Sequence, residues 1–295
     1  MRYGDFRSLC ERSPLPVCRV FIRGDDRKFV LDNLDICSLK ETIIGGSTKM
    51  LNIPDFAISI VAFLATVYLG FKAHRKLAAV GRREMSLLLS LFCILLVANL
   101  VGSDLWFKST RVSKWLGIAN TALEVSFFWA LILVGLVGFQ ILPDGSFASI
   151  LSIVVTTIIV FVGIGYIAAD TAFGISDGLK PKDSDPFYSP ALFTVYLVFP
   201  LVSIVIYLAS QIVVVVKYLA VRGPLAWLLV SVACFALAQA LMFAVSRKIC
   251  TGTNKKIDGA FFATLLDSAA VFCIYGFWAA ITEDDSEDYA GMYKF

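Results

Sequence analysis

Seven long apolar blocks constrain this chain more than any other feature of its sequence. Each is close to the roughly 20 apolar residues that a helix needs to cross a bilayer. Because lipid offers no partner to free backbone groups, such spans must be helical. The pattern predicts an all-α integral membrane protein with seven transmembrane helices. The blocks cover residues 53–71, 85–103, 115–139, 147–169, 190–216, 224–245 and 257–281.

The composition excludes most other classes of protein. Of the 295 residues, 58% are hydrophobic and 17% are charged, whereas a soluble domain has about 45–50% apolar and about 25% charged residues. The net charge of +3 is too small to indicate a nucleic-acid partner. The chain has one histidine and none of the common hydrolase or phosphate-binding motifs. We therefore expect no catalytic residue, no cofactor and no metal site, and we expect the protein not to be an enzyme.

Three regions follow from the distribution of polar residues. Residues 1–50 form a polar N-terminal segment with no apolar signal sequence, residues 51–281 form the membrane domain, and residues 282–295 form an acidic tail. An odd number of spans places the two termini on opposite sides of the membrane. Pro200 lies inside the fifth block, where a missing N–H is expected to kink the helix.

The distribution of basic residues gives only a partial answer about orientation. The first loop, residues 72–84, holds five Lys and Arg, whereas the segment before the first span holds only Lys40 and Lys49 close to it. The positive-inside rule then puts the first loop in the cytosol and the N-terminus in the lumen or outside. Counted over all six loops, the N-terminal side has nine basic residues and the other side has seven, so charge alone does not decide.

The cysteines separate into two groups. Cys93, Cys234 and Cys273 fall within spans, where cysteine is typically a small apolar packing residue. Four others all lie on the N-terminal side of the membrane, and an oxidising lumen would allow them to form two disulfides. Their pairing stays open, as do free cytosolic thiols and a zinc site without C-x2-C spacing. The four disulfide candidates are Cys10, Cys18, Cys37 and Cys250.

Two carboxylates, Glu124 and Asp267, lie deepest in the apolar blocks. An intramembrane acid is costly and is by default a functional candidate. One hypothesis is a proton or cation relay in a seven-helix transporter or receptor. The alternative is that each acid is protonated or hydrogen-bonded between packed helices, with donors such as Asn99, Asn120, Gln211 and Gln239.

Two further features suggest contacts with other molecules. Ala236, Ala240 and Ala244 form a stripe of small residues on the sixth span, suited to close helix packing; packing within the bundle is the commoner use and docking of a partner helix the alternative. The tail carries a run of acids that is either solvated or a di-acidic export signal read by the COPII coat. Its acidic residues are Glu283, Asp284, Asp285 and Glu287.

Four segments, in this order around seven spans, resemble the fungal chitin synthase export chaperone family. They are Tyr3-Gly4-Asp5-Phe6 followed by Cys10 and Cys18, then Gly81-Arg82-Arg83-Glu84, Gly138-Phe139-Gln140 with Asp144-Gly145, and Asp258-Gly259 after Cys250. The resemblance extends from residue 3 to the tail. At Pro143 the chain departs from the pattern, in which an acidic residue precedes Asp-Gly.

The resemblance implies a chaperone of the endoplasmic reticulum membrane with a lumenal N-terminus and a cytosolic C-terminus. Its client would be a chitin synthase, a polytopic membrane glycosyltransferase of cell wall biogenesis, whose transmembrane region it would bind and with which it would travel to the plasma membrane. The residues of the four segments are then candidates for partner binding, and membrane lipids and COPII are the other expected partners.

Overall fold

The structure is a computed structural model that describes residues 2–13, 15–21, 42–44, 48–50, 53–76, 79–102, 110–139, 145–176, 187–219 and 223–282. Its described part contains seven helices long and apolar enough to cross a membrane, which confirms the predicted all-α, seven-span fold. Each of the first four spans is a single helix: α3 (Ile53–Arg75), α4 (Arg82–Gly102), α5 (Thr110–Val137) and α6 (Phe147–Phe173).

The fifth and sixth spans are interrupted helices, and the seventh is a single helix. The fifth span runs through α7 (Pro190–Phe193), η2 (Thr194–Val198), α8 (Phe199–Val213) and η3 (Val214–Leu219), and the sixth through α9 (Leu225–Ala240), η4 (Leu241–Val245) and α10 (Ser246–Gly252). The seventh is α11 (Gly259–Ile281). The segments η2, η3 and η4 are π-helical turns. η2 lies immediately before the Phe199-Pro200 pair, where proline removes one backbone donor from the helix.

Short elements of the N-terminal segment precede the spans. The helix α1 (Arg7–Arg12) is followed by a 3-10 helix, η1 (Pro16–Phe21). Strands β1 (Thr42–Ile44) and β2 (Thr48–Met50) pair antiparallel, with Thr42 opposite Met50. The hydrophobic periodicity did not predict this hairpin, because strands of three residues carry too few positions to show alternation.

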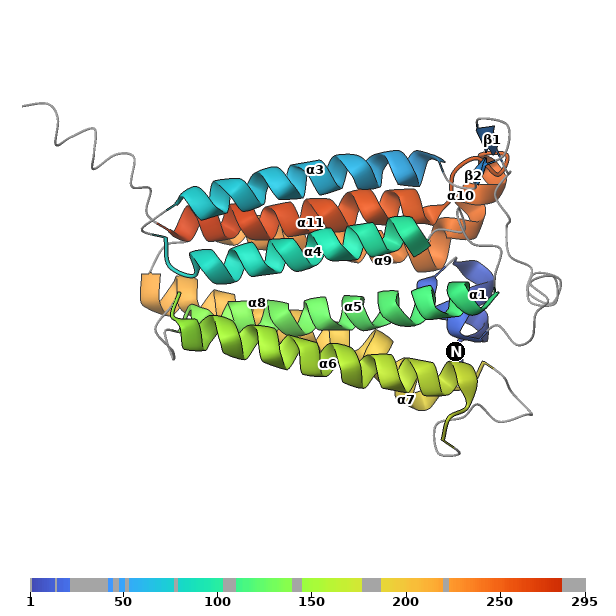
Figure 1. Cartoon of the computed structure of the whole chain (residues 1–295). Coiled ribbons are helices and arrows are strands. Elements are labelled where there is room, and N and C mark those ends of the chain that lie inside the picture. The colour runs from blue at the N-terminus through green and yellow to red at the C-terminus, as the bar shows by residue number, and fades with distance from the viewer. Residues whose placement is uncertain are drawn as a thin grey trace, which may run out of the picture.

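The seven spans lie side by side and alternate in direction, so that the bundle has two ends (Figure 1). We call α1 and η1 together the plug, and the end of the bundle where they lie the plug end. The opposite end holds the last turn of α3 and the first turn of α4, and we call it the basic end because Lys72, Arg75 and Arg83 are exposed there.

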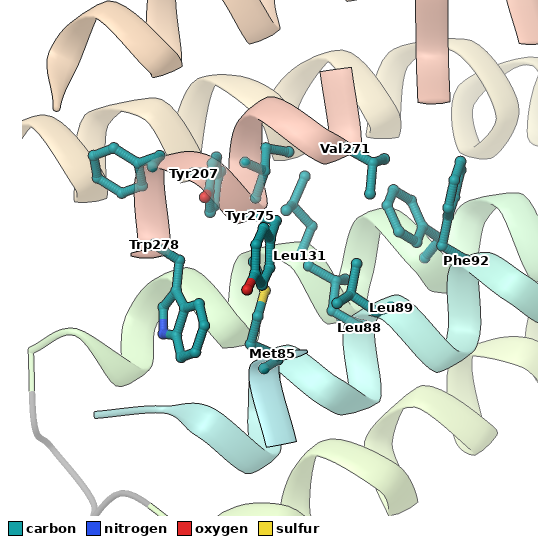
Figure 2. Close-up of a cluster of buried hydrophobic side chains, with 14 of the residues drawn as sticks. Met85, Leu88, Leu89, Phe92, Leu131, Tyr207, Val271, Tyr275 and Trp278 are labelled. Atoms are coloured by element: carbon teal, nitrogen blue, oxygen red, sulfur yellow. The ribbon is translucent and has the colours of Figure 1, made fainter. Parts of the chain in front are cut away.

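The larger apolar core joins α4, α5, α8 and α11 (Figure 2). Met85, Leu88 and Leu89 of α4 are each 1% exposed, and they face Leu131 of α5 and Tyr275 of α11 in this cluster. A second cluster lies at the plug end and contains Phe6 and Val17 of the N-terminal segment. The second cluster therefore packs the plug and Phe6 against the spans.

Candidate functional site

The basic end is held together by one buried carboxylate. Glu84, in the first turn of α4, is 0% exposed. Its Oε1 accepts hydrogen bonds from the backbone N–H of Gly145 and from the hydroxyl of Ser149, both at 2.8 Å. Ser149 belongs to the first turn of α6, so Glu84 lies near the N-termini of two helices, whose dipoles favour a negative charge. We call this arrangement the clamp.

The clamp joins two of the segments that were predicted as partner-binding candidates. Arg83 adds a second connection, because its Nη1 donates to the carbonyl oxygen of Gly145 at 3.0 Å. The neighbouring residue Arg82 reaches back to the carbonyl oxygen of His74 at 3.5 Å. Two segments about 60 positions apart in the chain therefore form one contact region, which the sequence alone did not indicate.

The seventh span closes the same end of the bundle. Trp278 of α11 donates its Nε1–H to the carbonyl oxygen of Val80 at 2.9 Å, and Gly81 lies between the Trp278 ring and Val137. Gly138 lies against Val214 of η3, while the ring of Phe139 packs edge-to-face on Tyr218. Gly81, Gly138 and Phe139 therefore fit the helix ends together at the basic end.

At the plug end, the Gly4-Asp5-Phe6 segment pairs with residues 187–190. The N–H of Phe6 donates to the Phe187 carbonyl at 3.1 Å, and Gly4 accepts from the Ser189 N–H at 2.9 Å. Gly4 has a φ of +86°, and a Cβ there would lie 2.9 Å from the Tyr188 ring. The position therefore requires glycine for both conformation and space.

Phe6 and Asp5 have different roles in this pairing. Phe6 is 0% exposed and packs against the rings of Phe21 and Phe193, so it fixes the plug to the fifth span. The carboxylate of Asp5 accepts from the N–H of Arg7 at 2.9 Å and so orders the start of α1.

A disulfide joins Cys10 of α1 to Cys18 of η1, with Cα atoms 5.7 Å apart. Cys250, at the same end of the bundle, is also in a disulfide. Cys93, Cys234 and Cys273, all within spans, are free thiols. Of the pairings that the sequence left open, the structure contains the one between Cys10 and Cys18. The cysteines within spans are free, whereas those at the plug end are oxidised, as predicted.

Asp258 and Gly259 begin the seventh span. Asp258 is the N-cap of α11, and its carboxylate accepts from the N–H of Ala260 at 3.1 Å. The Gly259 N–H donates to the Ser246 hydroxyl at 3.0 Å, and a Cβ on Gly259 would lie 2.6 Å from the Ser246 Cβ. This glycine is required because α10 and α11 approach so closely here.

The two intramembrane acids lie on different helices, Glu124 on α5 and Asp267 on α11. The Oδ1 of Asp267 is shielded by protein and has no hydrogen-bond partner among the described residues. Two of the amides that were predicted as donors to the acids bond elsewhere. The Asn120 amide donates to Asn99 at 2.6 Å, and the Gln211 amide donates to the Gly135 carbonyl at 2.9 Å.

The alanine stripe of the sixth span faces away from the bundle. Ala236, Ala240 and Ala244 are all exposed, so the expectation that they pack within the bundle is wrong. The interior of the bundle contacts the other side of this span, where Leu228, Ser231 and Ala238 are buried. The stripe is therefore an exposed surface with small side chains.

Some predicted residues lie outside the part of the chain that the structure describes. They are Cys37, Gln140, Asp144, Glu283, Asp284, Asp285 and Glu287.

Comparison with known proteins gives matches over nearly the whole chain. A family model described as "Chitin synthase export chaperone" matches residues 2–292. A protein of that name from Kluyveromyces lactis is 29% identical over 97% of this chain and 94% of its own length. The protein of that name from Aspergillus fumigatus is 28% identical over 99% of this chain and 86% of its own length. The one from Gibberella zeae is 27% identical over 97% of this chain and 84% of its own length.

Proposed function

Because this chain belongs to the chitin synthase export chaperone family, we propose that it promotes the folding and export of a chitin synthase by binding transmembrane helices of that client. The relatives are named for such a role. A binding role of this kind requires complementary surfaces at the level of the membrane and no reacting group, so we propose that the protein is not an enzyme.

The outward-facing alanine stripe is the observation that carries the binding proposal. Between helices in lipid the hydrophobic effect contributes little, so close packing of small residues has to provide the attraction. The small side chains of Ala236, Ala240 and Ala244 leave room for the backbone of another helix to approach α9 and η4 closely. Larger residues such as Leu229 and Leu237 are exposed on the same helix and would flank a docked helix of the client.

The location and orientation that we propose are the endoplasmic reticulum membrane, with the N-terminus in the lumen and the C-terminus in the cytosol. The disulfides support this orientation, because Cys10, Cys18 and Cys250 are all oxidised at the plug end, and disulfides persist in an oxidising compartment. The loop that follows the first span, with its exposed Lys72, Arg75 and Arg83, lies at the other end, and the charges beside the first span usually dominate the orientation. The protein would then remain bound to its client as far as the plasma membrane.

Two surfaces on the cytosolic side are proposed contacts. The exposed residues of the basic end would meet cytosolic domains of the client or lipid head groups, and the acidic tail would recruit the COPII coat. Reversing the charges of Arg82 and Arg83, with insertion into the membrane verified, tests the first contact. We expect weaker binding and export of the client, and unchanged export would end that part of the proposal.

Affinity purification in mild detergent tests the binding proposal. We expect a chitin synthase to copurify with the wild-type protein and to be lost from the Ala236→Leu and Ala240→Leu double variant. Ala209→Leu is the matched control, because Ala209 is also an exposed alanine, on α8. Equal recovery of the synthase with both variants would show that the stripe is not the docking surface, and the absence of any synthase would refute the function.

A glycosylation acceptor tests the orientation separately. Asp35→Thr creates an Asn-x-Thr acceptor at Asn33 in the N-terminal segment. We expect glycosylation of this variant and none of a chain with an acceptor appended after Phe295, and the reverse pattern would invert the orientation.

A further inference from the structure

The basic end presents positive charges that no described acid neutralises. Lys72, Arg75 and Arg83 are exposed there. Among the described residues of this end, the one carboxylate is that of Glu84, which is buried and already accepts two hydrogen bonds in the clamp. The described part of the chain therefore leaves a positively charged surface at this end, and such a surface attracts negatively charged groups.

The seventh span ends beside this surface. Lys76 donates from its Nζ to the Ala279 carbonyl at 3.5 Å, and Trp278 donates to the Val80 carbonyl at 2.9 Å. Both contacts join the end of α11 to the residues that follow α3. Ala73, in the last turn of α3, is 0% exposed and belongs to the apolar cluster on which Ala279 packs. The two helices also lie side by side in Figure 1, so α11 ends next to the turn of α3 that carries two of the exposed cations.

The chain continues from this point into its most acidic segment. Residues 283–287 read Glu-Asp-Asp-Ser-Glu, with four acids and no basic residue. A fully extended chain advances at most about 3.6 Å per residue, so the Cα atoms of all four acids lie within roughly 18 Å of that of Thr282. A tether this short gives the acids an effective concentration of about millimolar or more at the basic end.

We propose that residues 283–287 of the acidic tail dock on the basic end, with Lys72, Arg75 and Arg83 as their partners. Charge complementarity selects this occupant, because four acids follow directly on a surface with three exposed cations and no exposed acid among its described residues. Ion pairs at an exposed surface are individually weak and are screened by salt. Several of them on a short tether form a docked state that a second partner can displace.

This docking would regulate the proposed function, and its regulatory part rests on that function. In the proposed function the acidic tail recruits the COPII coat and the basic end contacts the client. A docked tail cannot offer its carboxylates to the coat, because they face the cations of the basic end. A client that binds the basic end displaces the tail and so shifts the population toward the form that the coat can bind. Export would then depend on a bound client.

Carbodiimide crosslinking of the purified full chain tests the docking without any client. The reagent joins a lysine amine to a carboxylate with which it is in contact. We expect peptides that link Lys72 or Lys76 to residues 283–287, in amounts that fall as salt is raised. Lys248 is the matched control, because it is exposed on α10 at the plug end (Figure 1) and should give no link to the tail.

The absence of any link between the tail and the basic end in the wild-type protein would overturn the proposal. The same reaction is run in nanodiscs of phosphatidylcholine with and without phosphatidylserine. Links that persist in both support the docked tail. Links that disappear when phosphatidylserine is present would assign the surface to anionic lipid and would also overturn the proposal.

Binding of the purified cargo-recognition subunit of COPII tests the regulatory part. The Lys72→Gln and Arg75→Gln double variant keeps the tail and removes two of its partners, and Lys248→Gln is the matched control. We expect the double variant without a client to bind the coat subunit about fivefold or more better than the wild-type protein and the control do. Equal binding by all three would overturn the regulation. Crosslinks in a wild-type protein whose double variant binds no coat subunit would keep the docking and refute the proposed coat recruitment.

Discussion

The two ends of the bundle differ in their most deeply buried contact. At the plug end this contact is apolar, because Phe6 is 0% exposed, while the disulfide between Cys10 and Cys18 closes the plug itself. At the basic end it is polar, because the buried carboxylate of Glu84 accepts two hydrogen bonds. Apolar contacts are non-directional, whereas a buried acceptor depends on specific donors. The ends should therefore differ in which changes they tolerate.

The largest effect is expected at Glu84. Glu84→Ala leaves the Gly145 N–H and the Ser149 hydroxyl without their acceptor, and each buried donor left unsatisfied costs about 1–3 kcal/mol. Hydrogen exchange should show lost protection in the first turns of α4 and α6, with the plug still protected. Glu84→Gln keeps an acceptor of the same shape and should lose much less. Equal protection in wild type and Glu84→Ala would mean that the clamp does not hold this end.

A comparable effect at the opposite end is expected from Phe6→Ala. Removing a fully buried phenyl ring costs about 3–5 kcal/mol, and here the loss should fall on the plug. Amide exchange between Phe6 and Phe21 should accelerate while the first turn of α4 stays protected. Arg12→Ala is the control, because Arg12 lies on α1 and is exposed. If Phe6→Ala destabilised both ends equally, the two ends would not be separate units of stability.

A smaller effect is expected from the disulfide. Replacing Cys10 and Cys18 by serine opens a short loop, for which the chain-entropy relation gives about 2–3 kcal/mol. The melting temperature should fall, and reducing agent should then change the double variant less than it changes the wild-type protein. Peptide mapping without reduction should find Cys10 linked to Cys18, and Cys250 oxidised. Alkylation of all three residues in native membranes would contradict the proposed lumenal plug.

The smallest effect is expected at Arg83. Its side chain is exposed and makes one hydrogen bond, to the Gly145 carbonyl, so Arg83→Gln should cost about 1 kcal/mol or less. Stability measured by thermal unfolding should stay near that of the wild-type protein. A loss of stability as large as that of Glu84→Ala would mean that the Arg83 guanidinium group, and not the Glu84 carboxylate, holds the clamp together.

The sequence predicted the fold well because apolar length reports directly on membrane spans. It predicted the cysteine groups for a similar reason, since the spans define which cysteines share a side of the membrane. It did not predict that Glu84 and Gly145 meet, because no periodicity connects segments 61 positions apart in a helical bundle. Nor did it predict which side of the sixth span faces lipid, because that span is apolar on all sides and so carries no clear amphipathic signal.

The central claim, that this chaperone binds its client through the outer face of the sixth span, is tested most directly by photo-crosslinking in cells. A photoreactive residue is placed at position 240, in the alanine stripe, and in a second strain at position 209 on α8. We predict that a chitin synthase is captured from position 240 and not from position 209. Capture from position 209 alone, or from neither position while export of the synthase proceeds normally, would contradict the claim.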